Sequence, residues 1–328
     1  MTRSLKHPDG EVSISDVGNG RVKIEVHPNS ETMFVPIRSC ETSYPIDLIE
    51  KILQVKGVAW LCDEIDRDED PNYVERLLLN DINAYFSTNY FAGKRILDFG
   101  CGSGASTAIL ARTFPESEIV GIELLDDLLE IARARQKHYG FENVTFLRSP
   151  EGSKLPDDIG DFDIAIMSAV YEHLLPDERK TILPALWSLI RPNGILFLNQ
   201  TPNRLFPFEL HTTMLPLINY LPDGLTHAVT RKFSKRIDPE DSWESLLRQG
   251  IRGATVREII SNLPNNAKLL EPSQKGLSDR IDLWFLNTNP NQKRTLKLVA
   301  RSVMKGLKAV TGISVVSDLS LAIRKISA

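Results

Sequence analysis

The sequence has little of what marks secreted or membrane proteins. It contains only 3 cysteines, too far apart for a CxxC motif, and no apolar run reaches the roughly 18 residues of a membrane span. The first residues also lack the apolar segment of a signal peptide. An odd number of cysteines without such a signal is typical of a reducing compartment. We therefore expect a cytoplasmic protein with no membrane-spanning helix and no metal site.

An excess of charge of one sign is also absent. The 328 residues include 39 basic and 43 acidic side chains, a formal net charge of -4, so nothing global favours binding to nucleic acid. Hydrophobic residues make up 42% and charged residues 25%, which is ordinary for a folded globular chain and excludes disordered and collagen-like classes. The length predicts one large domain or two smaller ones.

The middle of the chain alternates short apolar runs with helical patterns, which is typical of a parallel sheet. One helical pattern ends at Gly140, and another ends at Pro192 and Gly194. After the fifth run the alternation stops, and two later runs without a helix between them predict an antiparallel hairpin. The expected strands are residues 94–99, 118–123, 143–148, 161–168, 194–200, 267–273 and 280–287.

These runs predict an α/β fold with a doubly wound, mostly parallel, seven-stranded sheet and an antiparallel C-terminal hairpin. We assign this core to residues 91–290, with residues 201–253 as a substrate-side insertion. Residues 1–90 are an N-terminal extension, in which a strand (RVKIEV) and a helix (PIDLIEKILQV) precede an acidic run (DEIDRDED). Residues 291–328 are predicted to form a basic, amphipathic, helical tail.

The first strand of the core runs into a glycine loop, which contains Gly100, Gly102 and Gly104, and then directly into a helix. Glycines let the backbone approach a ligand closely, and the helix N-terminus offers free N–H groups to a pyrophosphate or to the carboxylate of an amino acid. Glu123 ends the next strand, where its carboxylate can accept hydrogen bonds from both hydroxyls of a ribose. The pattern predicts a nucleoside cofactor, and the glycines leave open which one.

Four segments resemble, in order and spacing, the successive motifs of class I S-adenosylmethionine-dependent methyltransferases: DFGCGSG, IVGIE, FDIAIMSAVYEHL and LIRPNGILFL. The resemblance covers residues 94–200. It implies S-adenosylmethionine as the cofactor, with Asp98 and the glycine loop at its methionine end and Glu123 at its ribose. It also implies that Ser168 lies near the methyl group. At the adenine the sequence departs from the aspartate usual in the family. Glu151 in RSPEGSKLP is the best match, and Ser149 and Pro150 are the alternatives.

Two histidines are candidates for catalysis, because a histidine is available as a base near neutral pH. His173 follows the fourth strand in YEHL and matches a histidine common in the family. It can act in catalysis or only hydrogen-bond the cofactor loop. His211 follows the fifth strand, close in sequence to the polar residues Asn203, Arg204 and Glu209, in a segment expected to cover the acceptor pocket. The alternative for His211 is an exposed loop residue without a role.

The segment SAVY replaces the N-P-P-Y motif of enzymes that methylate exocyclic amines of nucleobases, and no basic stripe with interleaved aromatics accompanies the core. We therefore expect no nucleic-acid partner and predict O-methylation of a small-molecule, lipid-linked or glycan hydroxyl. Two other classes remain: a cofactor-binding sensor or scaffold without turnover, and a nicotinamide-dependent enzyme on a related sheet.

Within the tail, residues 293–310 combine basic side chains at helical spacing with an opposite apolar face. Such a helix can lie on an anionic membrane surface. It can equally pack its apolar face on the core or on a second copy of the chain, as in a homodimer. The basic residues are Lys293, Arg294, Lys297, Arg301, Lys305 and Lys308, and the apolar ones are Leu296, Val299, Val303, Leu307 and Val310.

Overall fold

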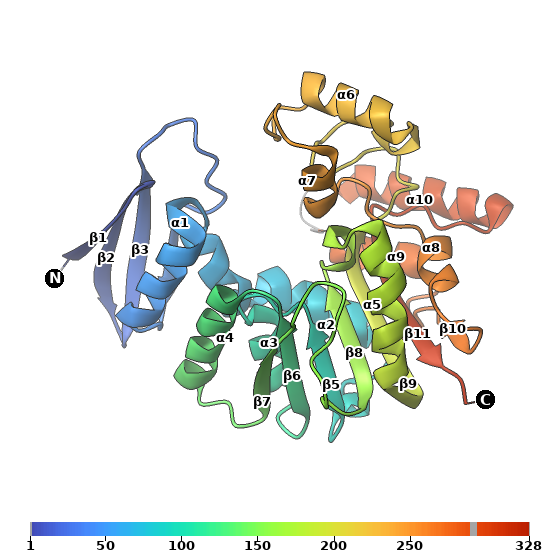
Figure 1. Ribbon diagram of the computed structural model, residues 1–328, viewed down its shortest axis with the longest axis horizontal. Coiled ribbons are helices and arrows are strands. Elements are labelled where there is room, and N and C mark those ends of the chain that lie inside the picture. The colour runs from blue at the N-terminus through green and yellow to red at the C-terminus, as the bar shows by residue number, and fades with distance from the viewer. Residues whose placement is uncertain (1, 289–293, 328) are drawn as a thin grey trace. The chain divides into compact units, whose positions relative to one another are not determined.

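Figure 1 shows the computed structural model, which describes residues 2–288 and 294–327. The chain forms two compact units, and each is built from two separate stretches of sequence. The first unit comprises Met1–Leu77 and Cys101–Arg148, and the second comprises Leu78–Gly100 and Ser149–Ala328. The predicted boundary near residue 90 therefore does not coincide with a boundary between these units.

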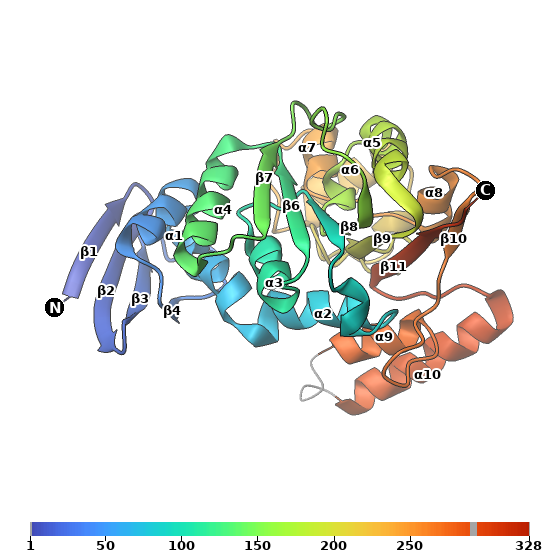
Figure 2. The same ribbon diagram turned by 90° about the horizontal axis from the view of Figure 1, so that it is seen from below.

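The first unit begins with a four-stranded antiparallel sheet in the order β1-β2-β3-β4. Apolar side chains on one face of β2 and β3 are buried, while their neighbours along each strand are more exposed, as expected for a sheet covered on one side. Helix α1 packs on this sheet (Figure 2). The sequence predicted only β3 of these strands, which are β1 (Thr2–His7), β2 (Gly10–Gly18), β3 (Arg21–Pro28) and β4 (Ser39–Thr42).

Helix α1 (Ile46–Glu69) confirms the predicted helix and extends it through most of the acidic run. It has a kink at Gly57, where φ is 73° and ψ is 175°. Several acidic side chains of this run, including Glu64 and Asp68, are buried. The chain continues through a π-helical turn (Pro71–Glu75), α2 (Arg76–Asn83) and a 3-10 turn (Thr88–Phe91).

The second sheet has seven strands in the order β10-β11-β9-β8-β5-β6-β7. Strand β8 is parallel to β5 and β9, β6 is parallel to β7, and β11 is antiparallel to both of its neighbours. This confirms the predicted α/β fold with a mostly parallel, seven-stranded sheet. The strands are β5 (Arg95–Phe99), β6 (Glu118–Glu123), β7 (Val144–Arg148), β8 (Phe162–Ser168), β9 (Ile190–Pro202), β10 (Ala267–Leu269) and β11 (Asp318–Lys325).

The predicted C-terminal hairpin is wrong in one strand. The segment RIDLWFLN is helix α9 (Arg280–Asn287), because the Asp279 side chain caps it by accepting hydrogen bonds from the N–H groups of Ile281 and Asp282 at 3.1 and 3.0 Å. The antiparallel partner of β10 is β11, which the sequence analysis had placed in a helical tail.

Helices alternate with the central strands as predicted. Helix α4 ends at Gly140, whose φ of 67° is typical of a glycine cap. Helix α5 ends at Leu189, earlier than the predicted stop at Pro192 and Gly194, because β9 already begins at Ile190. These elements are α3 (Ala105–Thr113), α4 (Asp126–Tyr139), a 3-10 turn (Tyr171–His173) and α5 (Pro176–Leu189).

The insertion after β9 contains short helices around a small apolar cluster of its own, formed by Ile218, Ile237, Leu246 and Ile251. Because these side chains pack on one another, the insertion is a folded layer rather than an open loop. Its elements are a 3-10 turn (Ile218–Tyr220), α6 (Asp223–Phe233) and α7 (Trp243–Arg248), and α8 (Val256–Ser261) follows.

Helix α10 (Arg294–Thr311) lies beside α9, as Figure 2 shows, with its basic side toward that helix. Arg301 and Lys305 pair with Asp282, and Lys308 pairs with Asp279. The apolar face therefore does not pack on the described core. Its five members, Leu296, Val299, Val303, Leu307 and Val310, are exposed.

Lys293, the first basic residue of the predicted stripe, lies outside the described residues. Contact of this face with an anionic membrane or with a second copy of the chain stays a prediction. Among residues 2–288 and 294–327, no helix combines the length and the hydropathy that crossing a bilayer requires.

Candidate functional site

The glycine loop turns between β5 and α3 with left-handed backbone conformations. A Cβ atom at Gly104, where φ is 84°, would lie 2.8 Å from the Cβ of Ala132 on α4, so only glycine allows this close packing. At Gly102, where φ is 56°, an added Cβ would meet no atom of the described residues within 4 Å. The main chain at Gly102 is therefore open to a ligand.

Glu123, at the end of β6, fixes the start of the loop. Its Oε2 accepts a hydrogen bond from the N–H of Gly102 at 3.0 Å, and its Oε1 accepts from the N–H groups of Leu124 and Leu125 at 2.7 and 3.1 Å. An ionised carboxylate offers about four acceptor positions. Glu123 thus holds the loop and retains capacity for one further donor, such as a ribose hydroxyl.

A buried ionic network supports the loop from α1 and α4. Arg135, which is fully buried, donates to the carbonyl oxygen of Ser103 at 2.7 Å and to Glu64 at 3.0 Å, and it pairs with Asp68 at 3.2 Å. The Ser103 hydroxyl also donates to Glu64. Burial alone would raise the pKa of Glu64, but the charges of Arg135 and Lys56 and the hydrogen bond from Ser103 outweigh it and lower this pKa to about 2.

Sequence reasoning missed this network, because it treated the acidic run as part of a separate extension. The only signal was the acidic run itself, since carboxylates within a helical pattern of apolar residues need a buried cation. The network shows that α1 and α4 hold the glycine loop in the first unit.

Three other predicted cofactor residues lie in the second unit. Asp98, in β5, is buried. Ser168 ends β8, and its buried hydroxyl has no hydrogen-bond partner among the described residues. Glu151 is exposed and pairs with Lys154. Gly100 belongs to this unit as well, and an added Cβ there would lie 2.7 Å from the Val170 side chain.

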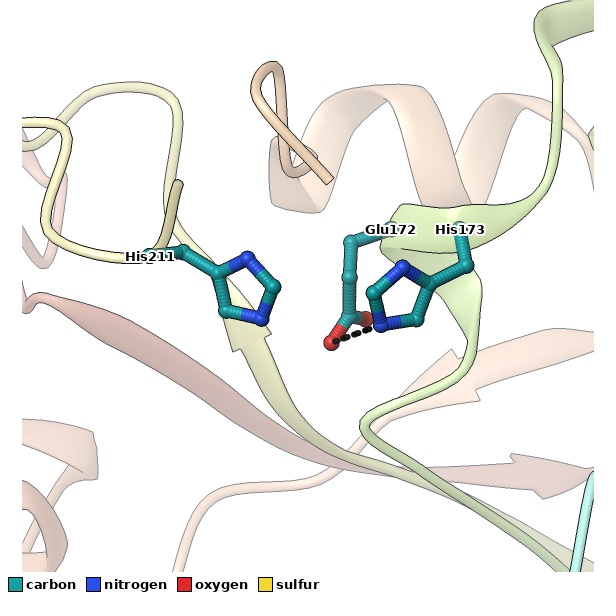
Figure 3. A group of neighbouring side chains, drawn as sticks. All are labelled: Glu172, His173 and His211. Carbon is teal, nitrogen blue, oxygen red and sulfur yellow. Dashed lines mark ion pairs between the residues drawn. The ribbon is translucent and has the colours of Figure 1, made fainter. Parts of the chain in front are cut away.

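The two predicted histidines come together with a third residue, Glu172, in what we call the His–Glu cluster (Figure 3). Glu172 and His173 lie on the 3-10 turn after β8, and His211 lies on the loop after β9. The imidazole centroids of His173 and His211 are 5.5 Å apart. One nitrogen of each histidine and a Glu172 oxygen all lie within 4.8 Å of one another. Sequence reasoning missed Glu172, although it adjoins His173.

The end of α7 orients both imidazole rings. The Nδ1 of His173 lies 2.7 Å from the carbonyl oxygen of Arg248, and the Nδ1 of His211 lies 3.1 Å from that of Gln249. Because a carbonyl oxygen only accepts, each Nδ1 carries the proton and each Nε2 keeps its lone pair. Both histidines therefore present a basic Nε2, and that of His173 lies 3.9 Å from Glu172 Oε1.

The Glu172 side chain is fully buried, and its hydrogen-bonding capacity is only partly used. Its Oε2 accepts a hydrogen bond from the Thr201 hydroxyl at 3.1 Å, whereas its Oε1 has no hydrogen-bond partner within the described part of the chain. Burial raises the pKa of Glu172 to about 7 and lowers the pKa of His173. A buried acceptor without a donor is costly and points to a missing partner.

A cavity of about 230 Å³ lies beside His211. Its polar lining includes Arg204, Arg252 and Asp318, together with apolar groups such as Phe208. Burial lowers the pKa of Arg204, and the charge of Arg252 acts in the same direction. The cavity can therefore receive a small molecule or one end of a larger one, with polar groups to orient it.

The loop that carries His211 is held by Glu209, whose carboxylate is buried. Its Oε1 accepts from the N–H groups of His211 and Thr212, both at 2.9 Å, and its Oε2 accepts from the N–H of Thr213 at 2.5 Å. Three main-chain hydrogen bonds fix the position of the histidine backbone. His211 is an exposed side chain, but it is not on a loose loop.

Comparison with known proteins identifies the central segment. Residues 97–196 match the family model described as "Methyltransferase domain". The chain is 34% identical over 112 residues to trans-aconitate 2-methyltransferase of Methylobacterium radiotolerans, covering 34% of this chain and 40% of that one. It is 27% identical over 165 residues to the ubiquinone biosynthesis O-methyltransferase of Acinetobacter baylyi, covering 49% and 64%. Among solved structures, PKMT2 from Rickettsia typhi in complex with AdoHcy gives a TM-score of 0.42 at 17% identity, covering 72% and 49%.

The family model and the two relatives named above confirm the resemblance seen in the four motifs. Residues 97–196 form a methyltransferase domain. Over this segment the chain is similar to proteins named as methyltransferases. The matched region spans less than two thirds of the length of the relatives named here, so their substrates do not transfer to this chain.

Proposed function

We propose that this protein transfers the methyl group of S-adenosylmethionine to a hydroxyl of a small-molecule, lipid-linked or glycan acceptor. The observation that carries the proposal is His211, an oriented histidine with a basic Nε2 on the wall of a cavity that has both polar and apolar lining groups. One relative named above is an O-methyltransferase by its name, which supports oxygen as the acceptor atom.

The residues of the glycine loop fit the cofactor. S-Adenosylmethionine supplies an electrophilic methyl group on a sulfonium. The open main chain at Gly102 suits the carboxylate of the methionine end, and the remaining acceptor capacity of Glu123 suits a ribose hydroxyl. We assign Asp98 to the methionine end as well, Ser168 to the neighbourhood of the methyl group and Glu151 to the adenine.

Within the cavity, His211 is the proposed general base. Its Nε2 can accept the proton of the acceptor hydroxyl, while the Gln249 carbonyl stabilises the protonated ring through Nδ1. Methyl transfer depends mainly on proximity and alignment. The main-chain hydrogen bonds that Glu209 accepts therefore help to position His211. His173, with the same ring orientation, is the second candidate for this role.

The cofactor assignment predicts a loss of affinity in Gly102→Val. The valine would place a side chain on the open main chain at a left-handed position, so S-adenosylhomocysteine should bind at least about tenfold more weakly in calorimetry, a loss of about 1.4 kcal/mol. Gly276→Val is the matched control, because Gly276 also has a positive φ of 73° and open space around it. Unchanged affinity in Gly102→Val would show that the loop does not hold the cofactor.

The acceptor is identified by incubating lipid and polar extracts with methyl-labelled S-adenosylmethionine and analysing the product by mass spectrometry. A labelled methyl ether supports the proposal. Binding of S-adenosylhomocysteine without any labelled product would favour the sensor or scaffold alternative. Binding of NAD instead of S-adenosylhomocysteine would favour the nicotinamide alternative.

A further inference from the structure

The His–Glu cluster has the composition of a metal site. Two imidazoles and one carboxylate are a ligand set used for divalent transition metals, as in catalytic zinc sites and in non-haem iron sites. We propose that Glu172 Oε1 and the Nε2 atoms of His173 and His211 bind one divalent transition-metal cation. All three donors belong to the second compact unit.

The surroundings of the histidines match those of metal ligands in proteins. Metal-ligating histidines almost always donate their other ring N–H to a carbonyl or carboxylate, which fixes the tautomer. Both rings do so here, at 2.7 Å to Arg248 and 3.1 Å to Gln249. Two histidines that are 38 positions apart in sequence thus receive the same support from consecutive carbonyls at the end of α7.

Gly250 makes this close arrangement possible. A Cβ atom at this position, where φ is 91°, would lie 2.9 Å from Nδ1 of His211 and 3.2 Å from Cγ of Glu172. Any other residue would push the His211 ring away from Glu172. The backbone next to the two orienting carbonyls is therefore shaped to the cluster.

The unsatisfied oxygen of Glu172 is the second, independent indication of a ligand. Its side chain is fully buried, Thr201 satisfies Oε2, and Oε1 has no hydrogen-bond partner among the residues that the structure describes. Figure 3 shows this carboxylate next to the His173 ring, with 3.9 Å between Oε1 and Nε2. A cation between the two atoms would supply the missing partner.

The distances require a small closure. Zinc ligands lie about 2.0 to 2.2 Å from the ion, so neighbouring donors are roughly 3 to 3.5 Å apart. The donors of the cluster lie within 4.8 Å of one another. Two small side-chain movements would close the difference: one of the exposed His211 ring, and one within the Glu172–His173 pair, whose Oε1 and Nε2 are 3.9 Å apart. Because imidazole nitrogens suit zinc, copper, iron or nickel better than calcium or magnesium, we assign the site to the transition metals.

The role of the cation rests on the proposed function, whereas its binding does not. A site with three protein ligands leaves coordination positions open, and His211 also lines the cavity. An acceptor hydroxyl bound to the cation would have a lowered pKa and would release its proton to water at neutral pH. Because the Nε2 of His211 cannot bind the cation and accept a proton at the same time, His211 is the general base of the metal-free protein, and the cation activates the hydroxyl in the metal-loaded protein.

The test uses the full chain without a histidine tag, freed of metal by a chelator and titrated with Co²⁺, whose visible absorption reports coordination. Zn²⁺ is titrated in parallel by calorimetry. We expect one site per chain and at least about tenfold weaker binding in His211→Ala and in Glu172→Gln. His227→Ala is the matched control, because His227 lies on α6, outside the cluster, and contacts the Asp241 carbonyl. Its affinity should equal that of the wild type.

Absence of stoichiometric binding to the wild type, or equal affinity in His211→Ala, would overturn the proposal. His211→Ala is the decisive variant, because His211 is exposed and its replacement leaves the buried carboxylate of Glu172 in place. Thermal unfolding checks that each variant is folded. S-Adenosylhomocysteine affinity is measured on the same samples without metal. Cofactor binding with no Co²⁺ binding removes only the metal site, and Co²⁺ binding with no cofactor binding removes only the proposed function.

Discussion

Asp81 on α2 has a fully buried carboxyl group, to which Asn287 donates a hydrogen bond at 2.7 Å. Burial raises its pKa to about 7, the charge of Asp318 acts in the same direction, and hydrogen bonds from Asn287, Ser320 and Gln200 oppose the shift. In the unfolded chain the pKa of an aspartate is about 4. Between these values, the folded protein holds a proton that the unfolded chain has lost.

This difference predicts how stability depends on pH. Because the folded-state pKa is the higher one, the stabilising contribution of the neutral carboxyl is complete below about pH 4 and is lost as the pH rises through about 7. The Asp81 carboxyl should therefore lower the free energy of unfolding by a few kcal/mol between about pH 5 and pH 8. Asp81→Asn should remove this share of the fall and leave the share of Glu172, whose pKa is also raised to about 7. Urea denaturation at both pH values measures it. Asp177→Asn, at a side chain that is 94% exposed, should keep the wild-type pH dependence, and the same slope in Asp81→Asn would refute the assignment.

At the scale of elements, Arg135 joins α4, α1 and the glycine loop. Replacement by methionine keeps an unbranched apolar stem but leaves Asp68 buried without its cation and Glu64 with Lys56 alone. Removing one partner of a buried ion pair costs about 3 to 5 kcal/mol, so Arg135→Met should lower the free energy of unfolding by that amount. Chemical denaturation checks it against Arg133→Met, an exposed position on the same helix. A loss of less than about 1 kcal/mol in Arg135→Met would contradict this account.

The sequence predicted the central elements well, because each of their patterns has one physical interpretation. An apolar run followed by glycines and a helical period defines β5, the glycine loop and α3. The segment of α9 is ambiguous, since Arg-Ile-Asp-Leu alternates like a strand, and the cap at Asp279 decided for a helix. Strand β11 was missed although Leu319, Leu321 and Ile323 alternate as in a strand, because the helical pattern before it was extended to the whole tail. Its pairing partners β9 and β10 are remote in sequence.

The candidate site also contains residues that the sequence predicted and a residue that it did not. Gly102 and Glu123 follow directly from motif spacing, and the structure links them by a hydrogen bond. The contribution of Glu172 could not be predicted, because it depends on the burial of one carboxylate and on the return of His211 from the insertion. Local spacing predicts a binding loop, whereas a cluster assembled from separate loops requires the tertiary fold.

At the scale of the whole molecule, each compact unit is discontinuous in sequence. The first unit combines residues 1–77 with residues 101–148, which include the glycine loop from Cys101, β6 and α4. Ile131 of α4 packs in the same apolar cluster as Leu48 and Ile52 of α1. The N-terminal residues therefore complete the core on which the proposed cofactor residues Gly102 and Glu123 depend.

This arrangement predicts that the protein does not tolerate removal of its N-terminal residues. A chain that begins at residue 91 would expose Ile131 and leave Arg135 without its carboxylates, so it should aggregate or remain partly unfolded and should not bind S-adenosylhomocysteine. Circular dichroism, size-exclusion chromatography and calorimetry measure these properties. Removal of residues 1–8 alone takes away only the edge strand β1 and should preserve binding. If the chain from residue 91 were monomeric, folded and able to bind the cofactor product, the N-terminal residues would be an independent domain instead.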